Sequence, residues 1–477
     1  MKSKLWQGFF YTSLAQVVNV VSVLLVNIIL SHKLAPSDFG IITIVQVLAT
    51  FISLFTGEAV PSAIIQKKEL VSKDFGVLFN YSVIFGSIAT LLFGLSGYLF
   101  AIVFRNHIYV RVCWLMSILV LTSFLNCIPQ GLFLRRLEFR ALSVRRMISS
   151  LLGLISGVGS VLLGAGIYAI AIALVVPAVF TLLFSILYVQ IDYTWNLTIK
   201  PLRVIYHYLI EQTKFSVLNY GYRNIDNVLI GKFLGSTALG FYSKSYQLLS
   251  QPITLFLGVV TPVLQPVLSN FEDDPEYIRS FFLKMINSVA FITIPISIFV
   301  SLNSKDIVMF LFGSQWSGAV MPMRILALSI WVQLLSQIIT PIWQSRNLPK
   351  LQTRNGLISF GVIAASIVMG ISTKSVVMVA VAVSVSYYLN FLISARMLMK
   401  QALQSQISEV FSVLKMPLLS GVINIGSLLL IDSFIQFSSF FLTLLVRGLL
   451  WLLEVIVFLG LTGNLQKIIS LFGRSQI

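Results

Sequence analysis

Apolar runs of about 20 residues or more recur along the whole sequence, and their length constrains the fold more than any other feature. A helix of that length crosses the roughly 30 Å hydrocarbon core of a bilayer. Strands of a membrane barrel would alternate apolar and polar residues, and these runs do not alternate. Because 57% of the residues are hydrophobic and only 10% are charged, a soluble fold could not bury so much apolar surface. The pattern therefore predicts an all-α integral membrane protein.

A hydropathy window of about 19 residues predicts about fourteen spans. Most Lys and Arg residues between them fall in alternate loops, which by the positive-inside rule places both termini in the cytoplasm. The net charge of +17 is explained by this placement, so we expect no nucleic-acid partner. The expected spans cover residues 8–30, 39–64, 76–103, 108–132, 146–165, 167–189, 212–235, 242–269, 280–302, 320–343, 355–373, 375–398, 412–431 and 438–461.

An acidic loop runs from Glu272 to Glu276 and departs from the basic character of its side. Acidic residues contribute little to orientation, so the loop does not change the predicted topology. Pro275 favours a helix that starts at the end of this loop. The alternative is a sugar-nucleotide site built on Asp273 and Asp274.

The chain resembles itself at an offset of 200 residues. The segment Leu34–Gly40 corresponds to Leu234–Gly240, and Gly57–Pro61 corresponds to Gly258–Pro262. The repeat unit holds six helices, and an even number gives both copies the same orientation, related by a pseudo-two-fold axis along the membrane normal. We expect a lobe over residues 1–205, a lobe over 206–400 and a helix pair over 401–477. Transporters built this way bind substrate between the halves, although channels are duplicated too and duplication alone can ease folding.

Two polar stripes begin the two halves. In the seventh span Asn219, Arg223 and Asp226 share one helix face, and Arg223 and Asp226 are spaced to pair. In the first span the stripe is uncharged. Either the stripes face each other across a cavity, or each makes ordinary interhelical hydrogen bonds. The first-span stripe consists of Thr12, Gln16, Asn19 and Asn27.

Further polar side chains lie near or within the expected spans. Lys232 and Lys244 flank the second repeat loop, Glu58 lies near the end of the second span, and Arg324 and Gln337 lie in the tenth. Snorkelling to the interface is an equal alternative for Glu58 and Arg324.

Arg447 and Glu454 lie deep in the last span, two turns apart. A buried charge needs a partner, so we expect them to pair with each other or with a neighbouring helix.

The sequence has no nucleophile-and-base set, no Gly-rich phosphate loop and no metal-ligand cluster, so we expect neither an enzyme nor a bound metal or cofactor. Without an ATP site, an ion gradient of H⁺ or Na⁺, the membrane potential or the substrate's own gradient must drive any transport.

The stretch from Phe215 to Gly235, continued by Leu239–Tyr242, resembles the signature of bacterial polysaccharide exporters. These are the lipid-linked oligosaccharide flippases of the multidrug/oligosaccharidyl-lipid/polysaccharide superfamily, and the likeness is to the colanic-acid and teichuronic-acid type. The resemblance implies two lobes around a cationic cavity in the bacterial cytoplasmic membrane, and a tail groove made by the last two helices. It also implies a cargo, an undecaprenyl-diphosphate-linked repeat unit flipped to the outer leaflet.

The resemblance implies roles for individual residues of this sequence. The cationic candidates for the diphosphate are Arg223, Lys232, Lys244 and Arg324, and the candidates for sugar hydroxyls are Asn19, Asn27, Asn219 and Gln337. Asp226 and Glu58 are the candidates for ion pairing or ion coupling. We expect a monomer that contacts membrane lipids, with a polysaccharide polymerase as a candidate partner. The alternatives are an ion-coupled drug or metabolite antiporter of the same fold and a membrane scaffold.

Overall fold

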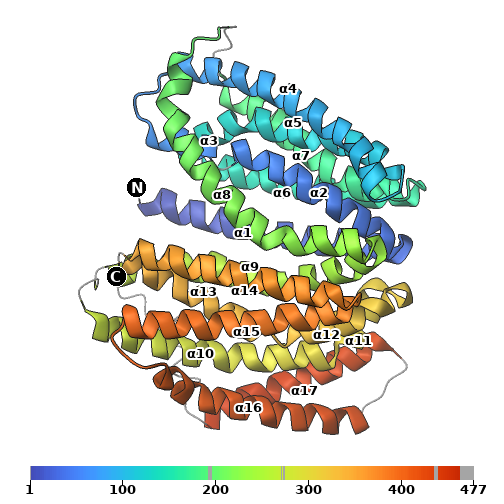
Figure 1. Cartoon of the computed structure of the whole chain (residues 1–477), viewed down its shortest axis with the longest axis vertical. Helices are drawn as coiled ribbons and strands as arrows, with labels where there is room; N and C mark the ends of the chain where they lie inside the picture. The colour runs from blue at the N-terminus through green and yellow to red at the C-terminus, as the bar shows by residue number, and fades with distance from the viewer. Residues whose placement is uncertain are drawn as a thin grey trace. The chain divides into compact units, whose positions relative to one another are not determined.

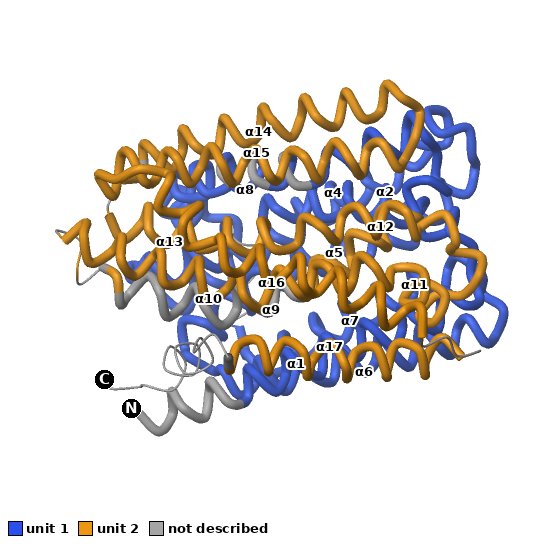
Figure 2. Tube along the Cα trace, turned by 90° about the horizontal axis from the view of Figure 1, so that it is seen from below, with its two compact units in different colours: residues 1–240 blue, residues 241–477 orange. Residues whose placement is uncertain are grey.

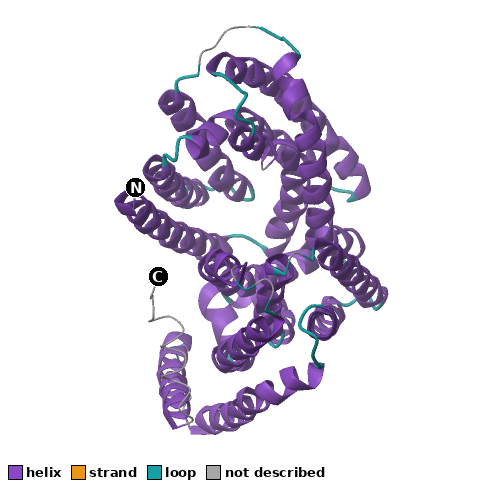
Figure 3. Ribbon diagram, turned by 90° about the vertical axis from the view of Figure 1, so that its left-hand side faces the viewer, coloured by secondary structure: helices purple, strands orange, loops and turns teal. Residues whose placement is uncertain are grey.

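A computed structural model describes residues 2–57, 59–191, 196–269, 271, 274–346, 348–434 and 439–461, with most of their side chains. Over these residues every regular element is a helix, as Figures 1 and 3 show. The predicted all-α architecture is therefore confirmed. By their contacts the residues form two compact units, Met1–Gly240 and Phe241–Ile477 (Figure 2). The predicted lobes 1–205 and 206–400 and the pair 401–477 stay a prediction.

Unit 1 is built from eight helices and the start of a ninth. The two pieces α2 and α3 together make one candidate membrane span, from Pro36 to Gln66. Helix α1 packs along α6, and α4 packs along α5. The helices are α1 (Lys2–Lys33), α2 (Pro36–Gly57), α3 (Ala59–Gln66), α4 (Ser72–Val103), α5 (Ile108–Arg135), α6 (Phe139–Leu162), α7 (Tyr168–Val189) and α8 (Lys200–Phe233).

Unit 2 holds the rest of α9 and the elements that follow it. Helix α10 contacts both α13 and α16, and α16 contacts α17. The elements are α9 (Ser236–Ser269), α10 (Pro275–Leu302), α11 (Ser304–Phe312), the 3₁₀ helix η1 (Ser314–Ala319), α12 (Val320–Ala327), α13 (Ile330–Ser345), α14 (Pro349–Ser372), α15 (Val376–Gln401), α16 (Ile407–Phe434) and α17 (Phe440–Leu461).

Eleven helices of the described chain are long and apolar enough to cross a membrane. A twelfth span results if Ser314–Ala327 and Ile330–Ser345, bent by 48° at their junction, cross as one. The protein is thus a multi-pass membrane protein. The count of fourteen is not confirmed, because the seventh and eighth predicted spans, α8 and α9, fall outside this set.

The predicted helix start at Pro275 is confirmed. Pro275 is the first residue of α10, where its missing N–H costs no hydrogen bond. Asp274 caps the helix, since its Oδ1 accepts a hydrogen bond from the Tyr277 N–H at 2.9 Å. The acidic loop thus serves as a helix cap at Asp274. Glu272 and Asp273 lie outside the described residues, so the sugar-nucleotide alternative is not tested.

The two repeat loops contact each other reciprocally within unit 1. A Cβ on Gly40 would lie 1.8 Å from the carbonyl oxygen of Ser236, and a Cβ on Gly240 would lie 1.9 Å from that of Pro36. Only glycine allows the backbones to approach so closely. Pro36 and Ser236 are themselves equivalent in the repeat. Such an exchange of equivalent contacts is what a two-fold relation produces, so the predicted alignment is confirmed at this loop pair.

Candidate functional site

The polar stripe of α1 lies against α6. The partner residues on α6 are spaced by three and four, as the stripe residues are, so one face of each helix meets one face of the other. This row is called the α1–α6 seam below. Its hydrogen bonds join Thr12 Oγ1 to Ser143 Oγ at 3.5 Å, Arg146 Nη1 to Gln16 Oε1 at 3.2 Å, and Ser150 Oγ to Asn19 Oδ1 at 2.9 Å.

Of the two alternatives for this stripe, interhelical hydrogen bonding accounts for the contacts of Asn19 and its neighbours. Asn27 behaves differently, because its Nδ2 donates to the Val23 carbonyl of its own helix at 2.7 Å. The contact of Asn19 and Asn27 with sugar hydroxyls stays a prediction.

Helix α6 adds cations beside a stripe that is itself uncharged. The helix begins at Phe139, seven residues before the predicted span, so Arg140 and Arg146 lie in its first two turns. Both side chains are exposed. Besides the bond from Arg146 to Gln16, the Arg140 guanidinium carbon lies 5.6 Å from the ring centroid of Tyr11. The seam is therefore a polar row that ends in exposed arginines, of which Arg140 precedes the predicted span 146–165 and Arg146 is its first residue.

Arg145 points to the other side of α6 and is 8% exposed. Its guanidinium donates to Ser185 Oγ at 2.6 Å and to Gln130 Oε1 at 2.5 Å, and it lies 5.2 Å from the centroid of the Phe133 ring. These contacts join α5, α6 and α7. Arg145 is thus fixed inside the unit, whereas its neighbour Arg146 faces outward.

Helix α8 carries the second predicted stripe. Asp226 is buried, and its Oδ1 accepts a hydrogen bond from the Asn227 N–H at 2.8 Å. Tyr220 donates from its hydroxyl to the Val47 carbonyl at 2.9 Å, which ties α8 to α2. The side chains of Arg223 and Asn219 lie outside the described part of the chain, as does Glu58, so the predicted Arg223–Asp226 pair is not tested.

Lys232 and Lys244, which flank the second repeat loop, have different surroundings. Lys232 is exposed at the end of α8. Lys244 is buried in α9, and its ammonium lies 5.3 Å from the Phe312 ring centroid and 5.9 Å from that of Trp316. A cation over aromatic faces is stabilised electrostatically, so this arrangement holds α9 against α11 and η1.

Arg324 and Gln337 lie on the two limbs of the bent pair. Arg324 is exposed on α12, and its Nε donates to Ser304 Oγ at 3.3 Å. Gln337 lies thirteen residues further along the chain, in α13 and roughly 20 Å away at 1.5 Å per helical residue. The structure therefore does not bring these two candidates together around a single phosphate group.

The deep charges of the last helix pair with neighbouring helices and not with each other. Arg447 Nη1 lies 3.0 Å from Asp306 Oδ2, and its Nη2 pairs with Asp432 Oδ1. Glu454 accepts hydrogen bonds from α16 instead, one of them from Asn424. The prediction that these charges find partners on neighbouring helices is confirmed.

Unit 1 also holds an apolar pocket of about 360 Å³. Its wall combines α2, α3, α4, α5 and α8, and the few polar side chains include Tyr81 and Ser82. Such a pocket suits a hydrocarbon chain and offers little to a sugar. Apolar residues that line it include Phe55, Leu78, Phe85, Leu92, Phe124 and Ile205.

Comparisons with known proteins agree with this architecture. Residues 29–321 match the family described as polysaccharide biosynthesis protein. An uncharacterized membrane protein in the cps region of Klebsiella pneumoniae is 23% identical over 472 residues, covering 96% of each chain. The succinoglycan biosynthesis transport protein ExoT of Rhizobium meliloti is 27% identical over 313 residues, or 63% of this chain and 61% of that protein.

A solved structure of the lipid II flippase MurJ, in an inward closed conformation, superposes with a TM-score of 0.78. It covers 95% of this chain and 98% of MurJ at 15% identity, so the likeness is one of fold. The chain therefore belongs to the polysaccharide biosynthesis protein family, the exporters and flippases of the multidrug/oligosaccharidyl-lipid/polysaccharide superfamily, whose members are transport proteins and not enzymes.

Proposed function

We propose that the protein is a flippase that carries an oligosaccharide repeat unit, linked to undecaprenyl diphosphate, from the cytoplasmic to the outer leaflet by alternating access. The observation that carries the proposal is the exposed end of the α1–α6 seam. There Arg146 contacts Gln16, and Arg140 lies over Tyr11. Exposed guanidinium groups beside a side-chain amide match a head group that joins a diphosphate to sugar hydroxyls.

The other parts of the proposal follow from charge and polarity. The basic loops favour a bacterial cytoplasmic membrane, with both termini in the cytoplasm. On that orientation the start of α6 is cytoplasmic, where the lipid-linked precursor is loaded. The apolar pocket of unit 1 is suited to part of the hydrocarbon chain. We further propose that the protein acts as a monomer without a cofactor, that an H⁺ or Na⁺ gradient drives it, and that a polymerase receives the product.

The test is transport of fluorescent lipid-linked oligosaccharide in proteoliposomes, read as loss of accessibility to an added quencher. Charge-assisted hydrogen bonds are worth about 1.5–3 kcal/mol, so Arg146→Ala is expected to weaken substrate affinity roughly 10- to 100-fold. Arg140→Ala is expected to act in the same direction. Arg111→Ala, which removes an exposed arginine from α5, is the matched control and is expected to leave transport unchanged.

Three results would decide against the proposal. Native protein that does not move the lipid-linked sugar under any gradient contradicts the function itself. Arg146→Ala with native affinity contradicts the role of the seam. Drug efflux by the purified chain, without movement of the lipid-linked sugar, would establish the antiporter alternative.

A further inference from the structure

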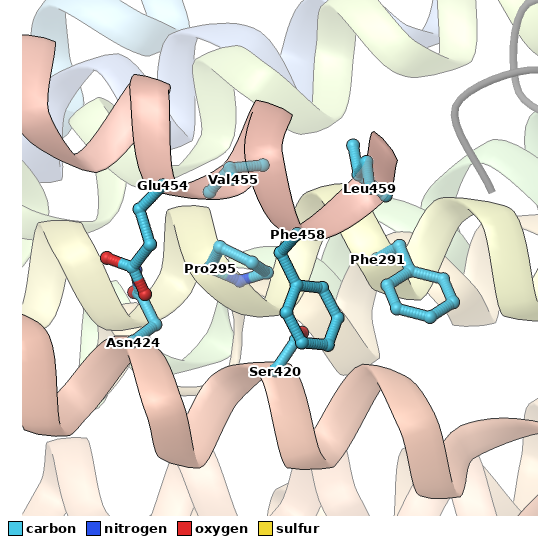
Figure 4. A pocket seen from close by; sticks show the side chains of 8 residues that line it. All are labelled: Phe291, Pro295, Ser420, Asn424, Glu454, Val455, Phe458 and Leu459. Carbon is cyan, nitrogen blue, oxygen red and sulfur yellow. The ribbon is translucent and has the colours of Figure 1, made fainter. Parts of the chain in front are cut away.

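A small pocket lies between α10, α16 and α17 in unit 2 and is unrelated to the cationic candidates above. Figure 4 shows the Glu454 carboxylate and the Asn424 amide pointing toward each other at one end of it. The rest of the wall is mostly apolar. The lining residues are Phe291, Pro295, Ser420, Asn424, Glu454, Val455, Phe458 and Leu459.

Glu454 lies within the last span, seven residues or about 10 Å before Leu461, the last residue of α17. It follows Phe440, the first residue of α17, by fourteen positions, or about 21 Å along the helix axis. Its Oε2 accepts hydrogen bonds from Asn424 Nδ2 at 3.2 Å and from Ser427 Oγ at 2.5 Å. Both bonds end on the same oxygen, so Oε1 keeps its capacity for a ligand.

Among the described residues, no Lys, Arg or His forms an ion pair with Glu454. Arg447, two turns away on the same helix, is held by Asp306 and Asp432. An ionised carboxylate at such a depth costs about 2.5–3.5 kcal/mol even on lenient insertion scales. The pocket therefore favours a species that brings positive charge.

Three other residues that line the pocket, Asn424, Ser420 and Phe291, carry oxygen atoms with unused acceptor capacity. Asn424 is 1% exposed, and in the described structure its Oδ1 is buried without a hydrogen-bond partner. Pro295 has no N–H, so the Phe291 carbonyl lacks the donor that a regular helix would supply. The Ser420 hydroxyl donates to the Pro417 carbonyl at 2.7 Å, which leaves its oxygen lone pairs able to bind a cation.

We propose that this pocket binds one Na⁺ ion, held by Glu454, the Asn424 side-chain oxygen, Ser420 and the Phe291 carbonyl. Carboxylate, amide and carbonyl oxygens suit hard cations. With a single carboxylate, a monovalent ion makes the site neutral, whereas a divalent ion would leave an uncompensated charge among apolar side chains. Binding of Na⁺ does not depend on the proposed transport function. Only the further statement that a Na⁺ gradient drives the flippase rests on that function.

Bound Na⁺ would join three helices. Glu454 is on α17, Asn424 and Ser420 are on α16, and Phe291 is on α10. Loading the site therefore links the last two helices to α10, and emptying it leaves the carboxylate uncompensated. An ion gradient can act on this part of unit 2 through that difference.

The first experiment measures binding of ²²Na⁺ to the purified full-length protein in detergent, with no sugar substrate present. We expect saturable binding of one ion per chain. Glu454→Gln is expected to lower the affinity at least tenfold, and Asn424→Ala severalfold. Glu276→Gln, at an exposed acidic residue at the start of α10, is the matched control and is expected to bind like the native protein.

A second variant, Asn424→Asp, changes the selectivity and so does not depend on loss of binding. It places a second carboxylate opposite Glu454, and we expect Ca²⁺ to compete with ²²Na⁺ at least tenfold better than in the native protein. Because Na⁺ binds the folded protein, it should also raise the thermal midpoint of the native chain, and this rise should be absent in Glu454→Gln.

The absence of saturable ²²Na⁺ binding, or native binding in Glu454→Gln, would overturn the proposal. Transport that is driven by a pH gradient alone and is abolished by Glu454→Gln would also overturn it. That result would show that the carboxylate binds a proton and not Na⁺. Binding is measured without sugar, so a chain that binds Na⁺ but moves no lipid-linked sugar refutes the proposed function and leaves the site standing. A chain that moves the lipid-linked sugar but does not bind Na⁺ refutes the site alone.

Discussion

Replacing Arg447 by Met tests whether one buried ion network fastens the last two helices to the rest of unit 2. Arg447 is 8% exposed, and its guanidinium pairs with Asp306 on α11 and with Asp432 at the end of α16. Its Nη1 also donates to Asn303 Oδ1 at 3.2 Å. Methionine keeps an unbranched apolar stem but removes the charge and all these hydrogen bonds.

The expected magnitude follows from the exposure of the two carboxylates. The Asp306 side chain is 18% exposed, so it would be left as a largely buried charge, a loss that costs about 3–5 kcal/mol for fully buried pairs. The Asp432 side chain is 55% exposed, and pairs of that kind contribute about 0–1 kcal/mol. We therefore expect Arg447→Met to lower the free energy of unfolding by about 3 kcal/mol.

The assay is reversible unfolding of the purified protein in mixed micelles, followed by helical circular dichroism. Asp306→Asn is expected to cost more than Asp432→Asn, because the first carboxylate is the more buried. The double variant of Arg447→Met with Asp306→Asn should be more stable than the sum of the two losses, since both charges are then gone. A loss below about 1 kcal/mol, no larger than that of the exposed control Arg111→Met, would refute the buried-network reasoning.

Three further changes and one control can be measured by the same unfolding assay. Gly40→Ala should cost about 1–3 kcal/mol, because its Cβ would meet the Ser236 carbonyl, and a neutral result would contradict the reciprocal packing of the loops. Gly221→Ala is its control, since a Cβ there meets nothing within 4 Å, and it should be neutral or stabilising. Arg135→Lys should destabilise by about 1–2 kcal/mol, because one ammonium cannot replace a guanidinium that donates to four carbonyls around the end of α3; native stability would contradict this. Asn19→Ala should cost only about 0.6 kcal/mol, the usual value of an interhelical hydrogen bond in a membrane, and a loss above about 2 kcal/mol would show that the seam carries more than this.

Local signals in the sequence predicted what is local in the structure. Pro275 after an aspartate predicts a helix start, because capping involves only a few neighbouring residues. The spacing of Gln16 and Asn19 likewise predicts one polar face on α1. Neither signal depends on a distant part of the chain.

Partners were not predictable where the contact spans a long sequence separation. Arg447 pairs with Asp306, 141 residues earlier, and nothing near either residue indicates the other. Arg146 is the first residue of the predicted span 146–165, so it was counted with the basic residues of the preceding loop and not as part of a site. In the structure α6 begins seven residues before the predicted span, at Phe139, so Arg146 lies within the helix. The arginine next to Gln16 was therefore missed as a site candidate.

The basic residues of the described chain differ in how much binding free energy each can contribute to an anionic substrate. Arg145 and Lys244 are buried, one donating to two side chains and the other lying over two aromatic rings. Drawing such a group toward a phosphate means giving up contacts that stabilise the fold, so little of the new attraction appears as affinity. Arg140 and Arg146 are exposed, and the contact each makes with α1 leaves most of the five guanidinium N–H groups for a ligand. A carrier must also release what it binds, and solvated cations hold phosphate less tightly than desolvated ones. These two arginines are for that reason better candidates for the first contact with a diphosphate than the buried lysine that sequence reasoning placed there.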